Sequence, residues 1–513
     1  MEKPDWDGGI IKFFYKSDKP NEEKNKTAVE VENAEILCDR AAEAFERGEK
    51  TTAVELWKAA AEKGDDHAMF CLGVCLFEGD GAEENDALAA QWFDKSARLE
   101  NSRARYYLAY CYEHGFGVER NPDEAFAWYT RSAEQDYAYA EHRLGLYYKN
   151  ADGSDLAANK TFYWFSQAAK QGLVPAIYEL GECYFDGIGE AVNKTKAIEL
   201  FRKAAETDYA PAVHKLGECA ERGDGVEKDI TAAIEYYKRA ADCGYPPSKY
   251  ALAVLYENGV GVEKSIAQAV RLYREAAEGG FPAAQNAYGW CFVVGKAVGR
   301  DLYEAARWFQ RAAKQGDMRA QYNLAMCYEE GHGVVQNVDK AFIWHLKAAE
   351  QGDDRAQLHV GWSYQVGNGV NVDGKEAFKW LKRSAEQGNA QAQSDVGYCY
   401  CGGIGVKKDK AEGFKWYLKA AEQNNPMAAF NVACSYRHGD GVKKNADLAV
   451  QWYEKAVGLG EADALLSLGA MYERGEGVKK DLAKAAEWYK KALDNGNPAA
   501  EFLLGRKKFA KYR

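Results

Sequence analysis

The chain has 513 residues, of which 67 are Lys or Arg and 78 are Asp or Glu, so its formal net charge is −11. This acidic balance argues against a nucleic-acid binder, which needs a basic groove for the backbone phosphates. No apolar run is long enough to span a membrane, and the early stretch IIKFFY is short and interrupted by Lys12, unlike a signal-peptide core. We therefore expect a cytoplasmic protein that neither binds nucleic acid nor inserts into a membrane.

Two segments precede the regular part of the chain. Residues 1–29 are polar apart from the apolar hexad, and we expect a flexible segment that either caps the first hairpin or lies in a groove of the protein as a ligand in cis. Residues 30–64 predict a shorter helical hairpin, because Ala53, Leu56, Trp57 and Ala60 follow a helical spacing. This hairpin lacks the glycine turn of the units that follow it, which is typical of a cap.

A small residue recurs every 36 positions, without a single insertion, through the rest of the chain. We call it the small-residue position. It is occupied by Gly73, Ala109, Gly145, Gly181, Gly217, Ala253, Gly289, Ala325, Gly361, Gly397, Ala433, Gly469 and Gly505. Twelve full repeats therefore run from 65 to 496, numbered here one to twelve. The acceptance of Gly or Ala alone indicates a limit on size, as expected where two helices lie close together.

Each repeat predicts two amphipathic helices joined by a glycine turn. In repeat twelve the apolar residues are Ala464, Leu468 and Tyr472 in the first helix, then Ala485, Trp488, Tyr489 and Ala492 in the second. The turn carries two glycines, which indicates backbone with positive φ. Four residues after the second glycine stands a residue that can cap the second helix. Eleven of the twelve have a suitable side chain: Asn85, Asn121, Asn193, Asp229, Ser265, Asp301, Asn337, Asp373, Asp409, Asn445 and Asp481.

The glycine pair Gly115 and Gly117 also allows a second interpretation, a phosphate-binding loop before a helix. Two observations argue against it. The same loop occurs twelve times, whereas a binding loop normally occurs once. The amides that a phosphate would need are expected to be capped by Asn121. We interpret the glycines as the end of one helix and Asn121 as the start of the next.

The motif of repeat twelve, ADALLSLGAMYERGEGVKKDLAKAAEWYKKALDNG, resembles the Sel1-like repeat, a relative of the tetratricopeptide repeat. The resemblance extends over most of the chain. It implies an all-α fold, a right-handed superhelical α-solenoid of helix-turn-helix repeats with capping helices at both ends. It also implies that first helices line a concave surface and second helices the convex side. We expect such a solenoid to be monomeric.

Two parts of the chain depart from this pattern. In repeat three Ala151, Ser154 and Ala157 all miss the turn motif, so we expect a looser hairpin there. Residues 497–513 hold only a first helix and a basic tail, which we expect to be a solvated cap face. The tail contains Lys507, Lys508, Lys511 and Arg513.

The twelve cysteines predict neither disulfides nor a metal site. Seven of them share one position, two residues after the small-residue position, and other repeats fill it with Tyr, Leu, Ser or Met. Such a position is typical of packing, and stacked helices lie too far apart for a bridge. The seven are Cys75, Cys111, Cys183, Cys219, Cys291, Cys327 and Cys399. Cys71 with Cys75, or Cys399 with Cys401, has no second ligand pair at a usual zinc spacing. We expect no metal and no cofactor.

No enzyme signature appears in the sequence, and the eight histidines are scattered. We therefore expect a non-enzymatic scaffold or adaptor that binds a protein or peptide partner. Two alternatives stay open, a groove binder of a glycan or another small ligand, and an enzyme with an unrecognised site.

The candidates for binding residues are the positions whose residue the repeat pattern does not dictate. The position directly after the small-residue position faces away from the core stripe of the first helix, and in repeats seven to ten it is large in succession. We call Trp290, Met326, Trp362 and Tyr398 the inner stripe. Its expected neighbours are Val293, Val294 and Val366, with Arg319 and Arg355 near the helix starts. The stripe predicts a peptide-recognition surface, and the alternative is that these side chains fill the axis of a tight superhelix.

Overall fold

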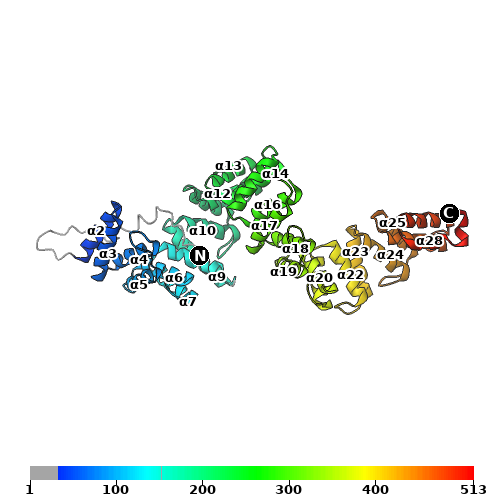
Figure 1. The fold of residues 1–513 in the computed structure, drawn as a ribbon, viewed down its shortest axis with the longest axis horizontal. Helices are drawn as coiled ribbons and strands as arrows, with labels where there is room; N and C mark the ends of the chain where they lie inside the picture. The colour runs from blue at the N-terminus through cyan, green and yellow to red at the C-terminus, as the bar shows by residue number, and fades with distance from the viewer. Residues whose placement is uncertain (1–32, 152, 513) are drawn as a thin grey trace. The chain divides into compact units, whose positions relative to one another are not determined.

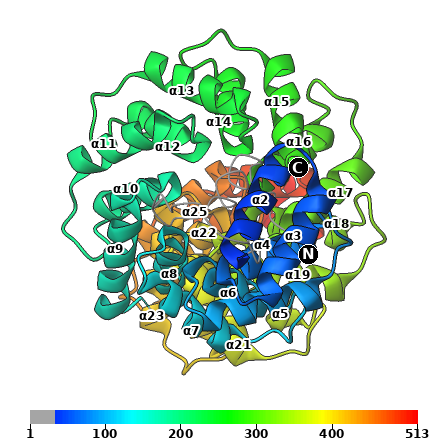
Figure 2. The ribbon, with the colours of Figure 1, turned by 90° about the vertical axis from the view of Figure 1, so that its left-hand side faces the viewer.

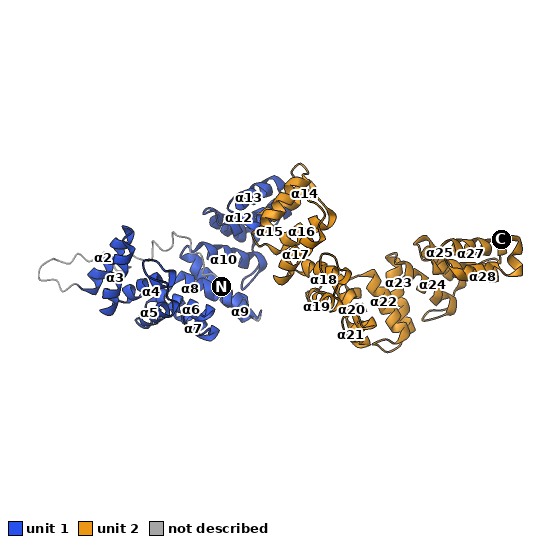
Figure 3. Cartoon of the chain, viewed as in Figure 1, with its two compact units in different colours: residues 1–248 blue, residues 249–513 orange. Residues whose placement is uncertain are grey.

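The computed structural model describes residues 33–151 and 153–512, and all its regular elements are helices (Figure 1). The predicted segment 1–29 lies outside the described residues. The chain divides into two compact units, one ending at Ser248 and one beginning at Lys249 (Figure 3). None of the described helices combines the length and apolar character required to cross a bilayer.

The helices of the first unit form six successive antiparallel pairs, and each pair packs against the next. They are α2 (Ala34–Glu46), α3 (Lys50–Glu62), α4 (Asp66–Glu78), α5 (Asp86–Arg98), α6 (Ser102–His114), α7 (Pro122–Ala133), α8 (Ala138–Lys149), α9 (Asp155–Lys170), α10 (Val174–Asp186), α11 (Lys194–Ala205), α12 (Ala210–Arg222) and α13 (Ile230–Asp242). In Figure 2 the first helices α8, α10 and α12 lie on the inner side of the curve that these pairs follow, and α9, α11 and α13 lie on its outer side.

The division between the units falls within α14 (Pro246–Asn258), and the second unit continues the same alternation. Its further helices are α15 (Ile266–Glu278), α16 (Pro282–Val294), α17 (Leu302–Lys314), α18 (Met318–Glu330), α19 (Val338–Glu350), α20 (Asp354–Val366), α21 (Gly374–Glu386), α22 (Ala390–Gly402), α23 (Lys410–Glu422), α24 (Pro426–His438), α25 (Ala446–Gly458), α26 (Asp463–Arg474), α27 (Leu482–Asp494), α28 (Pro498–Leu504) and the 3₁₀ helix η1 (Lys507–Tyr512). The fold is an all-α solenoid, as predicted.

The glycine turns have the predicted left-handed backbone. Gly117, the second glycine of repeat two, has φ of 67°, and a Cβ on it would lie 2.1 Å from the carbonyl oxygen of Asp86 in the preceding repeat. The turn therefore needs glycine both for its conformation and for a close approach between neighbouring repeats. In repeat seven Ala297 takes this position with φ of 55°, which strains an L-residue.

The eleven predicted N-caps are confirmed, since each side chain accepts a hydrogen bond from one or two amides of the second helix that follows. In repeat three a different residue caps the second helix. The Ser154 side chain accepts a hydrogen bond from the Ala157 amide, so α9 begins three residues before the corresponding position of other repeats and runs for 16 residues. The missing cap at Ala157 thus lengthens the second helix by about one turn.

The small-residue position lies where the two helices of a repeat meet. A Cβ on Gly217 would lie 2.6 Å from the ring of Tyr237 on the second helix, and one on Gly469 would meet Tyr489 at the same distance. The predicted size limit is therefore steric. The packing slot of the cysteines is buried as well, and all seven of its thiols lie in the interior.

The described basic residues of the C-terminal tail, Lys507, Lys508 and Lys511, are exposed, while the apolar Phe509 between them is buried. Phe509 is fully buried against Tyr489, with ring centroids 5.5 Å apart. Arg506 forms a 3.0 Å ion pair with Glu473, and Lys508 also pairs with this carboxylate. The basic residues therefore close the last repeat by neutralising a nearly buried acid, which a tail exposed on every side could not do.

Candidate functional site

The inner stripe consists of side chains that the core does not use. Trp290 on α16, Trp362 on α20 and Tyr398 on α22 are 51%, 43% and 54% exposed, and Met326 on α18 is half-buried. Trp380, at the regular second-helix position of repeat nine, is only 5% exposed and stacks under the Arg383 guanidinium. Two classes of tryptophan therefore exist in this chain, and those of the stripe face solvent.

In the first two repeats the side chain directly after the small-residue position is buried. Val74 of repeat one and Tyr110 of repeat two are buried, and the Tyr110 ring lies 4.1 Å from that of His114. Exposure of large apolar residues at this position is thus a property of particular repeats and not of the repeat pattern.

The valines extend two members of the stripe along their helices. Val294 and Val366 stand four residues after Trp290 and Trp362, on the same helix face, and both are exposed. Val293 is half-buried and packs against the hydrophobic core of repeats seven and eight. Val294 and Val366 therefore belong to the exposed surface, whereas Val293 supports it from below.

The two arginines near the stripe differ in their contacts. Arg355 donates a 3.0 Å hydrogen bond to Asp353, and its guanidinium lies 4.2 Å from the centre of the Tyr322 ring. Arg319 is exposed and makes no hydrogen bond or ion pair with the other described residues. Of these two arginines, Arg319 is the one that stays uncommitted among the described residues.

Arg319 and Trp290 line the same hollow. It has a volume of about 470 Å³ and lies among α14, α16 and the start of α18. Its wall includes Tyr250, Glu257, Asn286 and Asp317. The hollow combines an aromatic edge with charges of both signs, which suits a segment carrying an apolar anchor and a polar neighbour.

Glutamine pairs tie the repeats of the stripe together. Gln351 of repeat eight donates a 2.8 Å hydrogen bond to Gln321 of the same repeat and another of 3.0 Å to the Gly316 carbonyl of the repeat before. Gln321 in turn donates to the Ala313 carbonyl. Equivalent pairs join Gln315 to Gln285, Gln387 to Gln357 and Gln423 to Gln393, at 2.8 to 2.9 Å. This series, the glutamine ladder, spans repeats seven to ten, the repeats of the inner stripe.

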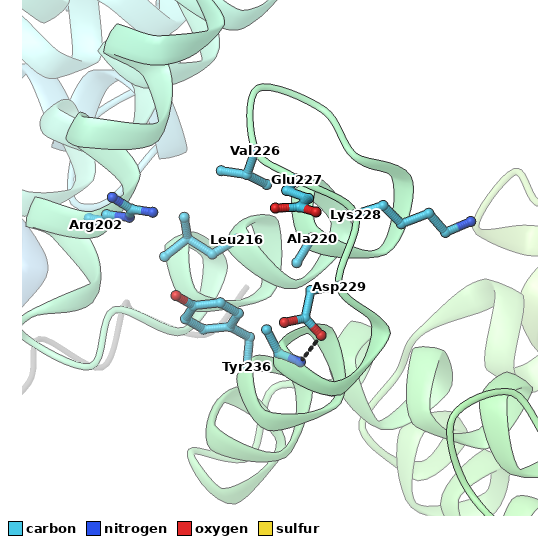
Figure 4. A pocket seen from close by; sticks show the side chains of 9 residues that line it. Arg202, Leu216, Ala220, Val226, Glu227, Lys228, Asp229 and Tyr236 are labelled. Carbon is cyan, nitrogen blue, oxygen red and sulfur yellow. Dashed lines mark hydrogen bonds between the residues drawn. The ribbon is translucent and has the colours of Figure 1, made fainter.

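The turn between helices forms hollows of another kind. Figure 4 shows one where repeat four meets repeat five, lined by Arg202, Leu216, Lys228 and Tyr236, with a volume of about 380 Å³. The Asp229 carboxylate accepts hydrogen bonds from the amides of Thr231 and Ala232, at 2.9 and 3.0 Å. An anion at this turn would have to displace a carboxylate from the helix start, so the hollow does not support the phosphate interpretation.

The structure also brings together three residues that sequence reasoning missed. Glu329, His345 and His359 are separated by 16 and 14 residues in the chain, but their ligand-type atoms all lie within 4.8 Å of one another. His345 stands where most repeats have Tyr or Phe, so an alignment of the repeats on the small-residue position could have revealed it. Only the stacking of repeat eight on repeat nine brings in His359.

Comparisons with known proteins give the family. The profile described as Sel1 repeat matches thirteen segments: 46–65, 66–101, 102–137, 138–173, 174–208, 210–245, 246–281, 282–317, 319–353, 354–389, 390–425, 426–461 and 462–497. The last twelve correspond to repeats one to twelve with small offsets, and the first covers the second helix of the N-terminal hairpin. A search of curated protein sequences found no significant match.

Two solved structures are similar to this chain. The chain is similar to a protective antigen present in uropathogenic Escherichia coli strains that displays an SLR fold, with 29% identity, a TM-score of 0.57 and coverage of 90% of this chain and 92% of that one. It is also similar to a Sel1 repeat protein from Oxalobacter formigenes, with 32% identity, a TM-score of 0.44 and coverage of 60% and 89%. Since the repeat profile covers most of its length, the chain belongs to the Sel1 repeat family.

Proposed function

We propose that this protein is a non-enzymatic interaction scaffold that binds a peptide segment of a partner protein along the inner stripe of repeats seven to ten. The observation that carries the proposal is the exposure of Trp290, Trp362 and Tyr398, which are all more than 40% accessible at one repeat position. Exposure of tryptophan side chains to water costs free energy, and the fold of a monomer does not require it. Burial of these side chains by a partner recovers that free energy.

Aromatic anchors suit this role energetically. Trp and Tyr are enriched among residues whose truncation costs 2 kcal/mol or more at interfaces, because they bury large areas with few rotatable bonds. The inner stripe stands on four consecutive first helices, α16, α18, α20 and α22, so an extended segment that crosses the repeats would meet its residues one after another. The glutamine ladder supports such binding, because helices held in register by buried hydrogen bonds lose little freedom when a partner binds.

Charge indicates the chemistry of the partner. The chain as a whole is acidic, so the uncommitted cation Arg319 stands out beside Trp290. We propose that the partner segment carries an apolar side chain for Trp290 and, next to it, a carboxylate for the Arg319 guanidinium. A bidentate Arg–carboxylate pair fixes orientation as well as adding attraction.

We further propose that the protein acts in the cytoplasm as a monomer. The support for the location is the burial of seven thiols at one packing slot, which suits a reducing compartment where free cysteines persist.

The test begins with selection of random displayed 16-residue peptides on the full-length chain, followed by measurement of binding of a selected peptide by fluorescence polarisation. We expect enriched sequences to combine aromatic or aliphatic anchors with Asp or Glu. The double variant Trp290→Ala, Trp362→Ala should weaken binding by about 100-fold or more. Arg319→Gln should weaken binding of an acidic peptide about 10-fold and reduce its dependence on salt.

The matched control is Tyr303→Ala, because Tyr303 is an exposed aromatic residue on α17 of repeat seven that lies outside the stripe. This variant should bind as the wild type does. If selected peptides lose as much affinity with Tyr303→Ala as with the double variant, or lose none with either, the proposed surface is wrong.

A further inference from the structure

Glu329, His345 and His359 meet where repeat eight packs on repeat nine. Glu329 lies at the end of α18, His345 in the middle of α19 and His359 on α20. One carboxylate oxygen, Oε2 of Glu329, is 3.3 Å from Nε2 of His345 and 3.6 Å from Nδ1 of His359. The two imidazole rings are stacked with centroids 4.5 Å apart, and each forms a T-shaped pair with the Tyr322 ring, at 5.4 and 5.8 Å.

Other repeats use the same three positions for a different purpose. In repeat two the Tyr129 hydroxyl donates a 2.7 Å hydrogen bond to Glu113, and Arg143 of repeat three completes the group with a 2.8 Å bond to the same oxygen. The Tyr–Glu pair recurs at Tyr237 and Glu221, at Tyr273 and Glu257, and at Tyr489 and Glu473. In repeats eight and nine the Tyr and the Arg are both replaced by His.

The replacement of tyrosine by His345 leaves one buried polar atom unpaired within the described part of the chain. His345 is 2% exposed, and its Nδ1 atom is buried without a hydrogen-bond partner among the described residues. A buried polar atom left in this way costs about 1 to 3 kcal/mol, which a phenol at the same position avoids. A buried polar atom left unpaired where other repeats have a phenol requires an explanation beyond the repeat pattern.

We propose that Glu329, His345 and His359 form a binding site for Zn²⁺, with the fourth coordination position open to water. Two imidazoles and a carboxylate are a donor set that zinc accepts when one position is left open. With zinc–ligand bonds of about 2.1 Å, neighbouring ligand atoms of a tetrahedral site stand about 3.4 Å apart. The two distances to the Glu329 oxygen, 3.3 and 3.6 Å, already match this value.

Binding requires one local change. The two histidine rings are almost parallel, at 9°, whereas two imidazoles on one ion must point their nitrogens at a common centre. His359 has the freedom to do so, because its side chain is 27% exposed while that of His345 is enclosed. The ion would connect α18 and α19 of repeat eight to α20 of repeat nine, so we expect it to stiffen this junction.

The experiment titrates Zn²⁺ into the full-length chain, freed of metal with a chelator, and follows binding by isothermal calorimetry. We expect one ion per chain and a higher melting temperature with Zn²⁺ present. His345→Tyr and His359→Arg restore the residues found around Glu113, so both variants are expected to fold. Each should bind Zn²⁺ about 100-fold more weakly or not at all, since even loss of an outer-shell partner costs 10- to 100-fold.

The control is His332→Asn, which removes a histidine that pairs with Glu330 at 2.7 Å on the surface, outside the group of three. This variant should retain the wild-type affinity. With Co²⁺ as the probe, the wild type should show a visible spectrum without the intense near-ultraviolet band of thiolate ligation. No binding by the wild type, unchanged binding by His345→Tyr, or a thiolate band would each overturn the proposal.

Discussion

Gln171 donates a 2.8 Å hydrogen bond from its side-chain amide to a carboxylate oxygen of Glu141, and this pair occupies the position that the glutamine ladder occupies in later repeats. In the ladder Gln321 both accepts a bond from Gln351 and donates one to the Ala313 carbonyl. An ionised Glu141 can only accept. Burial, with a smaller contribution from the charge of Asp136, raises the pKa of Glu141 to about 7.

We therefore expect Glu141→Gln to stabilise the protein at high pH and not at low pH. The folded state keeps the proton of Glu141 between about pH 4.5 and 7, where the unfolded state has released it. The contribution of Glu141 to stability is thus fully present below pH 4.5 and is lost as pH rises to 7. Above pH 7 the variant should be more stable by about 1 to 3 kcal/mol.

Hydrogen exchange of the α8 amides at pH 5 and pH 8 measures this difference locally, which suits a solenoid whose repeats need not unfold together. Gln321→Glu is the reverse change in the equivalent position, and it should introduce the same pH dependence into α18. A variant Glu141→Gln that gains equally at both pH values would show that the charge of Glu141 is not the cause.

A second prediction concerns the strained turn of repeat seven. Ala297 has φ of 55°, where the other repeats have glycine at the second turn position. Ala297→Gly removes the steric cost of the left-handed conformation, so we expect a gain of about 1 kcal/mol, measured by urea unfolding and by exchange of the α16 amides.

The opposite change provides the control for this turn. A Cβ on Gly333 would stand 2.0 Å from the Leu302 carbonyl oxygen, so Gly333→Ala should destabilise repeat eight clearly. If both substitutions left stability unchanged, the turn would be tolerant of side chains and the repeated glycines would need another explanation.

What the sequence predicted correctly is what depends on neighbouring residues. The cap at Asn121 involves amides two and three residues further on, and the positive φ of Gly117 is a property of a single residue; their recurrence makes the signal strong. The ion pairs of Arg506 and Lys508 with Glu473 could not be predicted, because they join residues more than thirty positions apart. A separation of 30 residues hid His359 from Glu329. Nothing local distinguishes Arg319, which has no ion pair among the described residues, from Arg355, which pairs with Asp353.

A third prediction follows from the burial of the thiols. Cys243 is the one exposed cysteine, while Cys219 and Cys399 are enclosed and burial raises the pKa of each to about 11. At pH 8 a thiol reagent should label one cysteine rapidly in the native protein, because attack requires an accessible thiolate. After denaturation without reductant all twelve should react.

The variant Cys243→Ser identifies the rapid phase, which it should abolish. Rapid labelling of any of the seven thiols of the packing slot would contradict the packing-slot interpretation. A total well below twelve in denatured protein would instead indicate disulfides, which the sequence predicts to be absent.

The last prediction separates the two classes of tryptophan by stability alone, without knowledge of a partner. Trp380 is 5% exposed in the core of repeats eight and nine, so Trp380→Ala removes a large buried side chain and should cost about 3 to 5 kcal/mol. Trp290 and Trp362 leave much of their surface in water, so the double alanine variant loses little burial and should cost about 1 kcal/mol or less. Thermal melts of the three proteins, with exchange of the α16, α20 and α21 amides, make the comparison. If the double variant melted as early as Trp380→Ala, the stripe would be part of the core, and no free energy would remain for a partner to gain by covering it.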